Sequence, residues 1–132
     1  MSRDVNALAD AIRPLCLQFL DRCTAQGFPV FVTQTRRTMD EQAALYAQGR
    51  TTPGKVVTNA KPGTSAHNFG LAFDIAWRTA EGGVTWDAPE PDGWEMVGAI
   101  GTDLGLVWGG DFSRFPDRPH FEMAGWRTVA GV

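Results

Sequence analysis

The chain is organised around the stretch Ser65-Ala66-His67-Asn68-Phe69-Gly70-Leu71-Ala72-Phe73-Asp74, which is answered near the C-terminus by Asp117-Arg118-Pro119-His120-Phe121-Glu122. The sequence has only two histidines, and each of these stretches holds one of them. Neutral imidazole and ionised carboxylate groups are good zinc ligands, and catalytic zinc sites take three protein ligands and keep a fourth position open. We therefore expect His67, Asp74 and His120 to form a zinc site.

The spacing of these residues predicts how they meet. His67 and Asp74 are seven residues apart, which is too far for one turn of helix. The run 71–77 is typical of a buried strand that is entered from a turn at Gly70. Side chains alternate along a strand, so Asp74 faces the side opposite to its apolar neighbours, and His67 folds back toward it from the preceding loop. The segment 119–123 predicts a second short strand that carries the third ligand.

Together the two motifs resemble the zinc D,D-carboxypeptidase and L-alanyl-D-glutamate endopeptidase family, which includes the vancomycin-resistance D,D-peptidases and many phage endolysins. The resemblance runs from about Thr33 to about Glu122. It implies an α+β fold with a small antiparallel sheet flanked by helices, the hedgehog/D-Ala-D-Ala-peptidase-like fold, in one compact zinc peptidase domain spanning residues 1–132. Besides the two motifs, the similar segments are Val32–Thr38, Glu41–Arg50 and Val107–Phe112.

The resemblance also implies two catalytic residues. Asp117 matches the family's general base, which takes a proton from the attacking water and passes it to the leaving amine. Zinc lowers the pKa of that water and polarises the scissile carbonyl. Arg37 matches an arginine that holds the substrate carbonyl or the developing oxyanion, a role suited to a planar cation. The neighbouring Arg36 leaves open which of the two faces the site.

Four further residues are candidates for contacts around the site. By strand alternation Glu122 lies on the same side as His120, where it can orient the ring through the other nitrogen. Ser65 matches a family serine that hydrogen-bonds near the metal or substrate, although a plain turn serine is the alternative. Gln42 is either close to the substrate or structural. Trp108 lines the pocket or belongs to the core.

The first half of the chain shows a helical and then an extended pattern. Apolar residues at spacings of three and four predict an amphipathic helix over 5–26, divided at Pro14, which we place in the first turn of a second segment. Gly27 ends it. The run 28–33 predicts a strand. A capping box at Thr38 and Glu41 then predicts a helix that reaches Gly49.

The second half alternates loops with regular elements. Turn-rich segments precede His67 and form a cleft wall, with a short strand predicted over 56–58. Residues 78–91 form a surface loop or hairpin in which we expect Trp86 to make ordinary packing contacts. A helix is predicted over 94–104, followed by a short strand over 106–108.

Bulk composition narrows the possible partners. The chain has 132 residues, an apolar fraction of 43% and a net charge of −3, which favours one globular domain and gives no basic footprint for nucleic acid.

Cys16 and Cys23 are seven residues apart in the helical pattern. That spacing is roughly 10 Å along the axis, beyond disulfide reach, so we expect reduced core residues. The segment 1–4 starts no apolar run long enough for a signal peptide or membrane span.

These features predict a zinc peptidase that cuts the L-alanyl-D-glutamate bond of the peptidoglycan stem peptide, in the manner of a phage endolysin. The alternatives are a D-alanyl-D-alanine carboxypeptidase for wall remodelling and a zinc module that binds a partner without catalysis. We expect a monomer without stable membrane association or nucleic-acid partner. We expect synthesis in the cytoplasm without a signal peptide, and the resemblance implies holin-dependent release to the cell wall.

Overall fold

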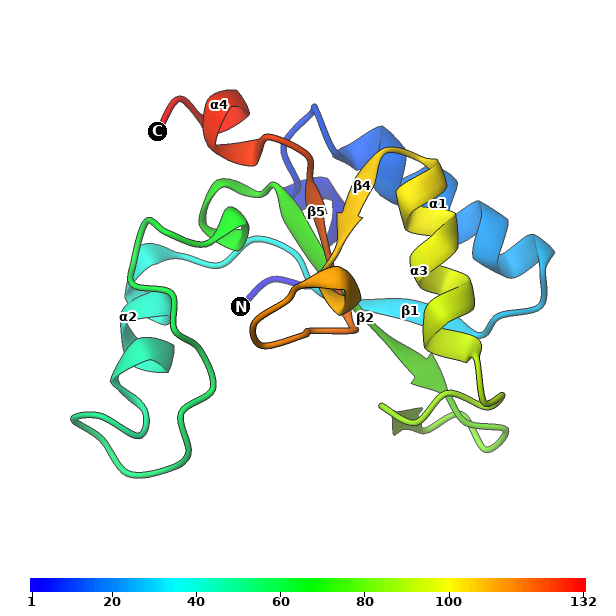
Figure 1. The fold of residues 1–132 in the computed structure, drawn as a ribbon, viewed down its shortest axis with the longest axis horizontal. Helices are drawn as coiled ribbons and strands as arrows, with labels where there is room; N and C mark the ends of the chain where they lie inside the picture. Colours follow the sequence, from blue (N-terminus) through cyan, green and yellow to red (C-terminus); the bar gives the residue numbers. More distant parts are fainter.

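The computed structural model describes residues 1–132, and its centre is one antiparallel sheet. The strands follow the order β1-β2-β5-β4, and β3 pairs with the end of β2 (Figure 1). The small antiparallel sheet predicted from the sequence is therefore confirmed. Its strands are β1 (Val30–Gln34), β2 (Ala72–Arg78), β3 (Val84–Thr85), β4 (Leu106–Trp108) and β5 (His120–Met123).

The helices lie on two sides of this sheet. Helices α1 and α3 pack against each other and the sheet, whereas α2 lies at the opposite side of the molecule (Figure 1). No helix combines the length and the apolar character needed to cross a membrane. The helices are α1 (Arg13–Ala25), α2 (Met39–Ala47), α3 (Gly93–Asp103) and α4 (Trp126–Ala130), and the short 3₁₀ helices are η1 (Val5–Ala7), η2 (Ala66–Phe69) and η3 (Gly109–Asp111).

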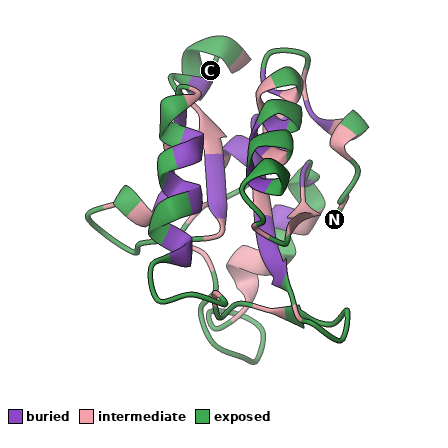
Figure 2. Cartoon of the chain, turned by 90° about the vertical axis from the view of Figure 1, so that its right-hand side faces the viewer, coloured by how far each residue is buried: buried purple, intermediate pink, exposed green.

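An aromatic core joins the two strands that carry the key motifs to the helices. Phe73 of β2 stacks on Phe121 of β5 with ring centroids 5.5 Å apart, and Phe19 of α1 contacts both rings. Each of these side chains is fully buried, a gain of about 1.5–3 kcal/mol per side chain. A Cβ at Gly101 would lie 2.5 Å from the Phe121 ring, so α3 approaches the sheet this closely only because glycine stands there. Figure 2 shows the buried residues along the strands and the inner sides of the helices.

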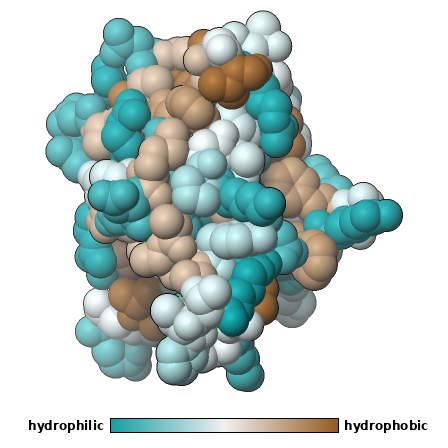
Figure 3. Space-filling model, turned by 90° about the vertical axis from the view of Figure 1, so that its left-hand side faces the viewer, coloured by the Kyte–Doolittle hydropathy of each residue, from teal (hydrophilic) through white to brown (hydrophobic).

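The register of the sheet separates this core from the polar side. Phe73 pairs with Phe121 on the core face, whereas the next pair along β2 and β5 is Asp74 with His120. Because successive side chains point to opposite faces, the polar pair lies on the face away from α1 and α3. Seen from the α2 side, strongly hydrophobic residues form only small separate patches among hydrophilic ones (Figure 3).

Most predicted elements are present with their ends shifted slightly, but two predictions are wrong. Pro14 lies in the first turn of α1 as expected, but the segment before it forms only the short 3₁₀ helix η1. The strand predicted over 56–58 is absent. Side chains satisfy the backbone of this loop instead, because Gln48 Nε2 donates to the carbonyl of Lys55 and Arg50 donates to that of Thr58, both at 3.0 Å.

Two local predictions hold. Thr38 Oγ1 accepts from the backbone N–H of Glu41 at 3.1 Å, and the Glu41 carboxylate accepts from the backbone N–H of Thr38 at 2.9 Å, which completes the capping box of α2. Cys16 and Cys23 are free and buried in the core, and burial raises the pKa of both thiols to about 12.

Candidate metal centre

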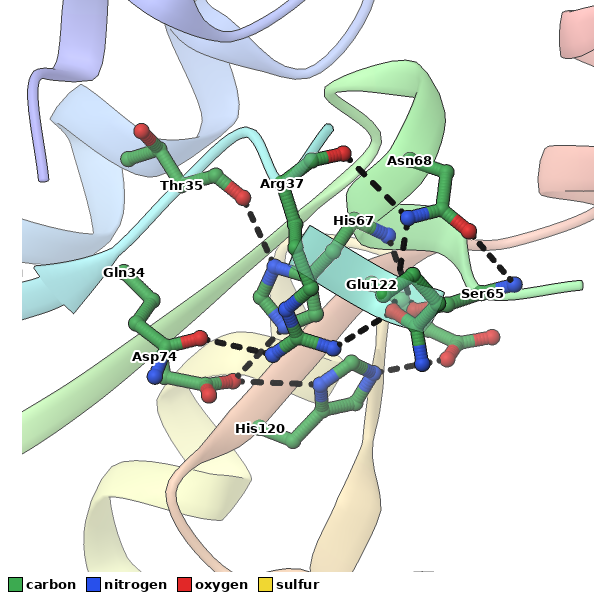
Figure 4. A network of polar contacts seen from close by, with 10 residues as sticks. Gln34, Thr35, Arg37, Ser65, His67, Asn68, Asp74, His120 and Glu122 are labelled. Atoms are coloured by element: carbon green, nitrogen blue, oxygen red, sulfur yellow. Dashed lines mark hydrogen bonds and ion pairs between the residues drawn. The ribbon is translucent and has the colours of Figure 1, made fainter. Parts of the chain in front are cut away.

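His67, Asp74 and His120 meet on the polar face of the sheet. His67 Nε2 and His120 Nδ1 each lie 3.1 Å from Asp74 Oδ1, and the candidate ligand atoms of the three residues all lie within 4.8 Å of one another (Figure 4). The two histidine side chains are almost completely buried. The predicted convergence of three distant residues is thus observed.

Local structure explains how each side chain reaches this point. Asp74 and His120 are direct neighbours in the sheet register. His67 lies in η2, a 3₁₀ helix capped by Ser65, and not in an irregular loop as predicted. Gly70 ends η2 with φ 67°, a left-handed conformation that glycine adopts without strain and that returns the chain into β2.

The hydrogen bonds on the far sides of the two rings leave the cluster compatible with a bound cation. His67 Nδ1 lies 2.7 Å from the carbonyl oxygen of Thr35, which can only accept, so Nδ1 carries the hydrogen. His120 Nε2 lies 2.8 Å from the carboxylate of Glu122 and carries a hydrogen for the same reason. In neutral rings, the remaining lone pairs then both face the oxygen of Asp74. This arrangement is repulsive without a positive charge between the groups, and it fits three ligands of a zinc ion.

The titration behaviour of the cluster reflects the same need for positive charge. Burial alone would raise the pKa of Asp74, but hydrogen bonds from His120 and His67 outweigh burial and hold it well below its usual range. Burial alone would lower the pKa of His120, but its hydrogen bonds to Asp74 and Glu122 raise it to about 10. A bound cation would supply the charge that the His120 ring otherwise takes up as a proton.

Asp117 stands on a loop beside the cluster, and the fold holds this loop in place. The backbone N–H of Asp117 donates to the carbonyl of Gly109 at 2.8 Å, and Trp108 Nε1 donates to the carbonyl of Arg118 at 2.7 Å. Trp108 is 8% exposed and does not line the cleft, so of its two predicted places the core is correct. Desolvation of the Asp117 carboxyl group, followed by repulsion from Asp74, raises its pKa above the ordinary value.

The structure also separates the two adjacent arginines. The guanidinium of Arg37 lines the cleft and donates to the side-chain oxygens of Gln42 at 2.8 Å and Gln34 at 2.6 Å (Figure 4). Arg36 points elsewhere, because its Nε donates to the carbonyl of Ala7 at 2.9 Å. Arg37 is therefore the arginine that can reach a substrate.

Gln42 and Ser65 support the site in different ways. Gln42 is fully buried and outside the cleft lining, so it holds the Arg37 guanidinium and does not touch a substrate. Ser65 lines the cleft and accepts from the backbone N–H of His67 at 3.3 Å. Asn68, which sequence reasoning missed, donates to the carbonyl of Arg37 and to Gln42. Its capping-box pairing with Ser65 was the available signal.

A cleft of about 680 Å³ opens over the cluster. Aromatic residues from distant segments, Trp86, Phe112 and Trp126, form part of its lining. The expectation that Trp86 makes ordinary packing contacts is wrong, because the residue is 54% exposed at the cleft. Its backbone is nevertheless fixed, since Trp94 Nε1 donates to the carbonyl of Trp86 at 2.9 Å.

Comparison with known proteins agrees with this geometry. Residues 58–123 match the family model described as D-alanyl-D-alanine carboxypeptidase. The chain is also 41% identical over 134 aligned residues to the peptidoglycan L-alanyl-D-glutamate endopeptidase CwlK of Bacillus subtilis (strain 168), a match that covers 89% of this chain and 80% of that protein. The chain belongs to the D-alanyl-D-alanine carboxypeptidase family. It is therefore a peptidase, as its motifs predicted.

Other members and neighbours of the D-alanyl-D-alanine carboxypeptidase family extend the comparison. The L-alanyl-D-glutamate peptidase of Listeria phage A118 is 31% identical over 120 residues, which cover 91% of this chain but 39% of that protein. The vancomycin-resistance D,D-pentapeptidase VanY, solved in complex with Zn(II), shares the fold with a TM-score of 0.61 at 19% identity, covering 95% of this chain and 79% of the other. The matched residues 58–123 contain the three candidate ligands and Asp117 but not Arg37.

Proposed function

We propose that residues 1–132 form a single zinc peptidase domain that hydrolyses the L-alanyl-D-glutamate bond of peptidoglycan stem peptides. The observation that carries the proposal is the meeting of two imidazole lone pairs and one carboxylate in an open cleft beside Asp117. The bond is proposed from the relatives, because CwlK and the phage protein are both named for it. The phage relative supports a role in cell-wall lysis, and we propose that the chain acts there as a monomer.

The donor set fits zinc, with His67, Asp74 and His120 as the ligands. A bound zinc ion would acidify a water molecule and polarise the scissile carbonyl. Glu122 accepts a hydrogen bond from the back of the His120 ring and so fixes its orientation toward the ligand cluster. The carbonyl of Thr35 does the same for His67.

Asp117 is the group that moves the proton. As general base it accepts a proton from the attacking water while the new carbon–oxygen bond forms, and it then gives this proton to the amine as the carbon–nitrogen bond breaks. A raised pKa suits both steps, because the carboxylate becomes a stronger base and remains a usable acid. Arg37 stays charged and donates to the carbonyl oxygen as negative charge develops there.

The same cleft chemistry would also serve a D-alanyl-D-alanine carboxypeptidase, and the description of the matching family model favours this second candidate. The two candidates differ in the released product. Cleavage of the L-alanyl-D-glutamate bond leaves a new amino terminus on glutamate, whereas the carboxypeptidase releases free D-alanine. A zinc module without catalytic function would release neither product, and it would have no use for Asp117.

Digestion of purified peptidoglycan, followed by mass analysis of the new termini, tests the proposal. We expect new glutamate amino termini, loss of the reaction with chelator and recovery when zinc is restored. Asp117→Ala should keep one bound zinc and lose hydrolysis, while Asp111→Ala, an exposed aspartate of η3 outside the cleft lining, is the matched control. Full activity of Asp117→Ala would remove this residue from the mechanism, and release of D-alanine alone would favour the carboxypeptidase.

A further inference from the structure

The substrate that this cleft is proposed to take brings its own negative charge to the reacting bond. A glutamate acylated on its amino group has two carboxyl groups, and only one of them can continue the peptide. The residue on the leaving side of the scissile bond therefore carries a free carboxylate unless it is amidated. With Asp74 holding zinc, the cleft still contains the carboxylates of Asp117 and Glu122, which repel such a group. A cation of the protein is needed to hold it.

Arg37 is poorly suited to this second task. Arg37 is 9% exposed as a residue, and both terminal nitrogens of its guanidinium donate to glutamine side chains, Gln42 and Gln34. These bonds aim it at one place, which we have assigned to the scissile carbonyl. The only other cationic residue of the cleft lining is Arg127.

Arg127 is exposed and free of any acidic partner. Two other exposed arginines do form ion pairs, Arg22 with Asp103 and Arg118 with Glu95. The guanidinium of Arg127 instead lies over the ring of Trp126, 4.4 Å from its centroid. Such an arrangement contributes about 0.5–1 kcal/mol at an exposed site and leaves the N–H groups available for a ligand.

The ring beneath Arg127 is buried and packs against the segment that carries His67. Trp126 is 5% exposed, lines the same cleft and stacks on Phe69, with ring centroids 5.8 Å apart. Phe69 is the last residue of η2, the short helix that carries His67. The position of Arg127 is thus tied to that of a metal ligand, as specific recognition beside the reacting bond requires.

We propose that Arg127 binds the free carboxylate of the glutamate on the leaving side of the scissile bond. This assignment rests on the proposed function and deepens it. It makes Arg127 a specificity-determining residue, because a guanidinium binds a carboxylate through charge-assisted hydrogen bonds and gains much less from a neutral amide.

Two synthetic stem peptides that differ only at this group test the assignment. One carries the free carboxylate on the glutamate, and the other carries the amide at the same carbon. Wild-type protein with zinc should cut the acid with a kcat/KM about tenfold above that for the amide, the ratio expected for one exposed charge-assisted contact. In Arg127→Gln the ratio should fall to near one, mainly through a higher KM for the acid. Arg127→Lys should restore part of the preference.

Arg78→Gln is the matched control, because Arg78 also stacks on an aromatic ring, 3.8 Å from the centroid of Phe31, but lies outside the cleft lining. It should keep the wild-type ratio. An unchanged ratio in Arg127→Gln, or an equal loss on both peptides, would overturn the assignment while leaving the proposed function intact. Wild-type protein that cuts neither peptide would refute the proposed function and the assignment together. A third peptide carries the amide on the residue that follows the glutamate, so it distinguishes a more distant carboxylate. If the preference of the wild-type protein follows that group instead, the assignment is also overturned.

Discussion

The substitution Gly109→Ala offers a sharp test of how Asp117, the proposed general base, is positioned. An ideal Cβ at Gly109 would lie 2.2 Å from the backbone carbonyl oxygen of Asp117 and 3.0 Å from Cβ of His120. Non-bonded carbon–oxygen distances are normally at least about 3.3 Å, so the Asp117 segment must move away by about 1 Å. That shift breaks the 2.8 Å hydrogen bond from the Asp117 N–H to the Gly109 carbonyl and disturbs His120, one of the three candidate ligands.

The expected magnitudes follow from this displacement. Overpacking of this kind costs about 1–3 kcal/mol of unfolding free energy, and a 1 Å misplacement of a catalytic group costs about a hundredfold in rate. The assay is kcat/KM on a stem peptide together with zinc content and a urea unfolding curve. Gly27→Ala is the control, since Gly27 has φ 79° and an added Cβ there would meet no atom within 4 Å, so alanine costs about 1–2 kcal/mol without moving Asp117. A Gly109→Ala protein with wild-type kcat/KM would refute the reasoning.

Two further predictions concern the cleft wall and acid stability. Trp86→Ala should raise KM severalfold with little change in kcat and change the unfolding free energy by less than about 0.5 kcal/mol, because the side chain is exposed at the cleft. Val84→Ala, equally exposed at 54% on the same hairpin, is its control, and equal KM values in both variants would contradict a substrate contact. The N-terminal amino group and the capping-box hydrogen bond lower the pKa of Glu41 from 4.5 to about 2. Because its pKa is lowered on folding, Glu41 stabilises the fold above pH 4.5, and this contribution is lost as the pH falls toward about 2. In Glu41→Gln, the unfolding free energy should therefore depend less on pH in that window. An acid denaturation curve that is the same in both proteins would count against the ion pair between Glu41 and the N-terminal amino group.

The ligand cluster was predictable because its chemistry is rare in this sequence. With only two histidines in the chain, few ligand sets are possible, and the alternation of side chains in a strand placed Asp74 and His120 correctly. The capping box at Thr38 was equally local and equally reliable. The capping box and the alternation within each strand depend on residues close in sequence, so they can be predicted without the tertiary fold.

What could not be predicted depends on contacts between distant segments. The β-branched residues at 56–58 suggest a strand, but no partner strand lies beside them, and Arg50 instead donates to the carbonyl of Thr58. Trp86 gives no local sign that its ring borders the cleft. The sequence leaves Trp108 between the pocket and the core, and only the fold shows that its indole holds the Asp117 loop. Arg127 reaches the cleft only because α4 packs against η2, a contact between segments that are distant in the sequence.

The pairing of Phe73 with Phe121 beside that of Asp74 with His120 has a consequence for errors in assembly. If one of these strands slipped by one residue, its phenylalanine ring would face the solvent and its polar partner, Asp74 or His120, would face the hydrophobic core. Chains with this pairing error would therefore lose the candidate ligand cluster and stability together. Copies of the chain with this pairing error are therefore expected to be inactive as well as unstable.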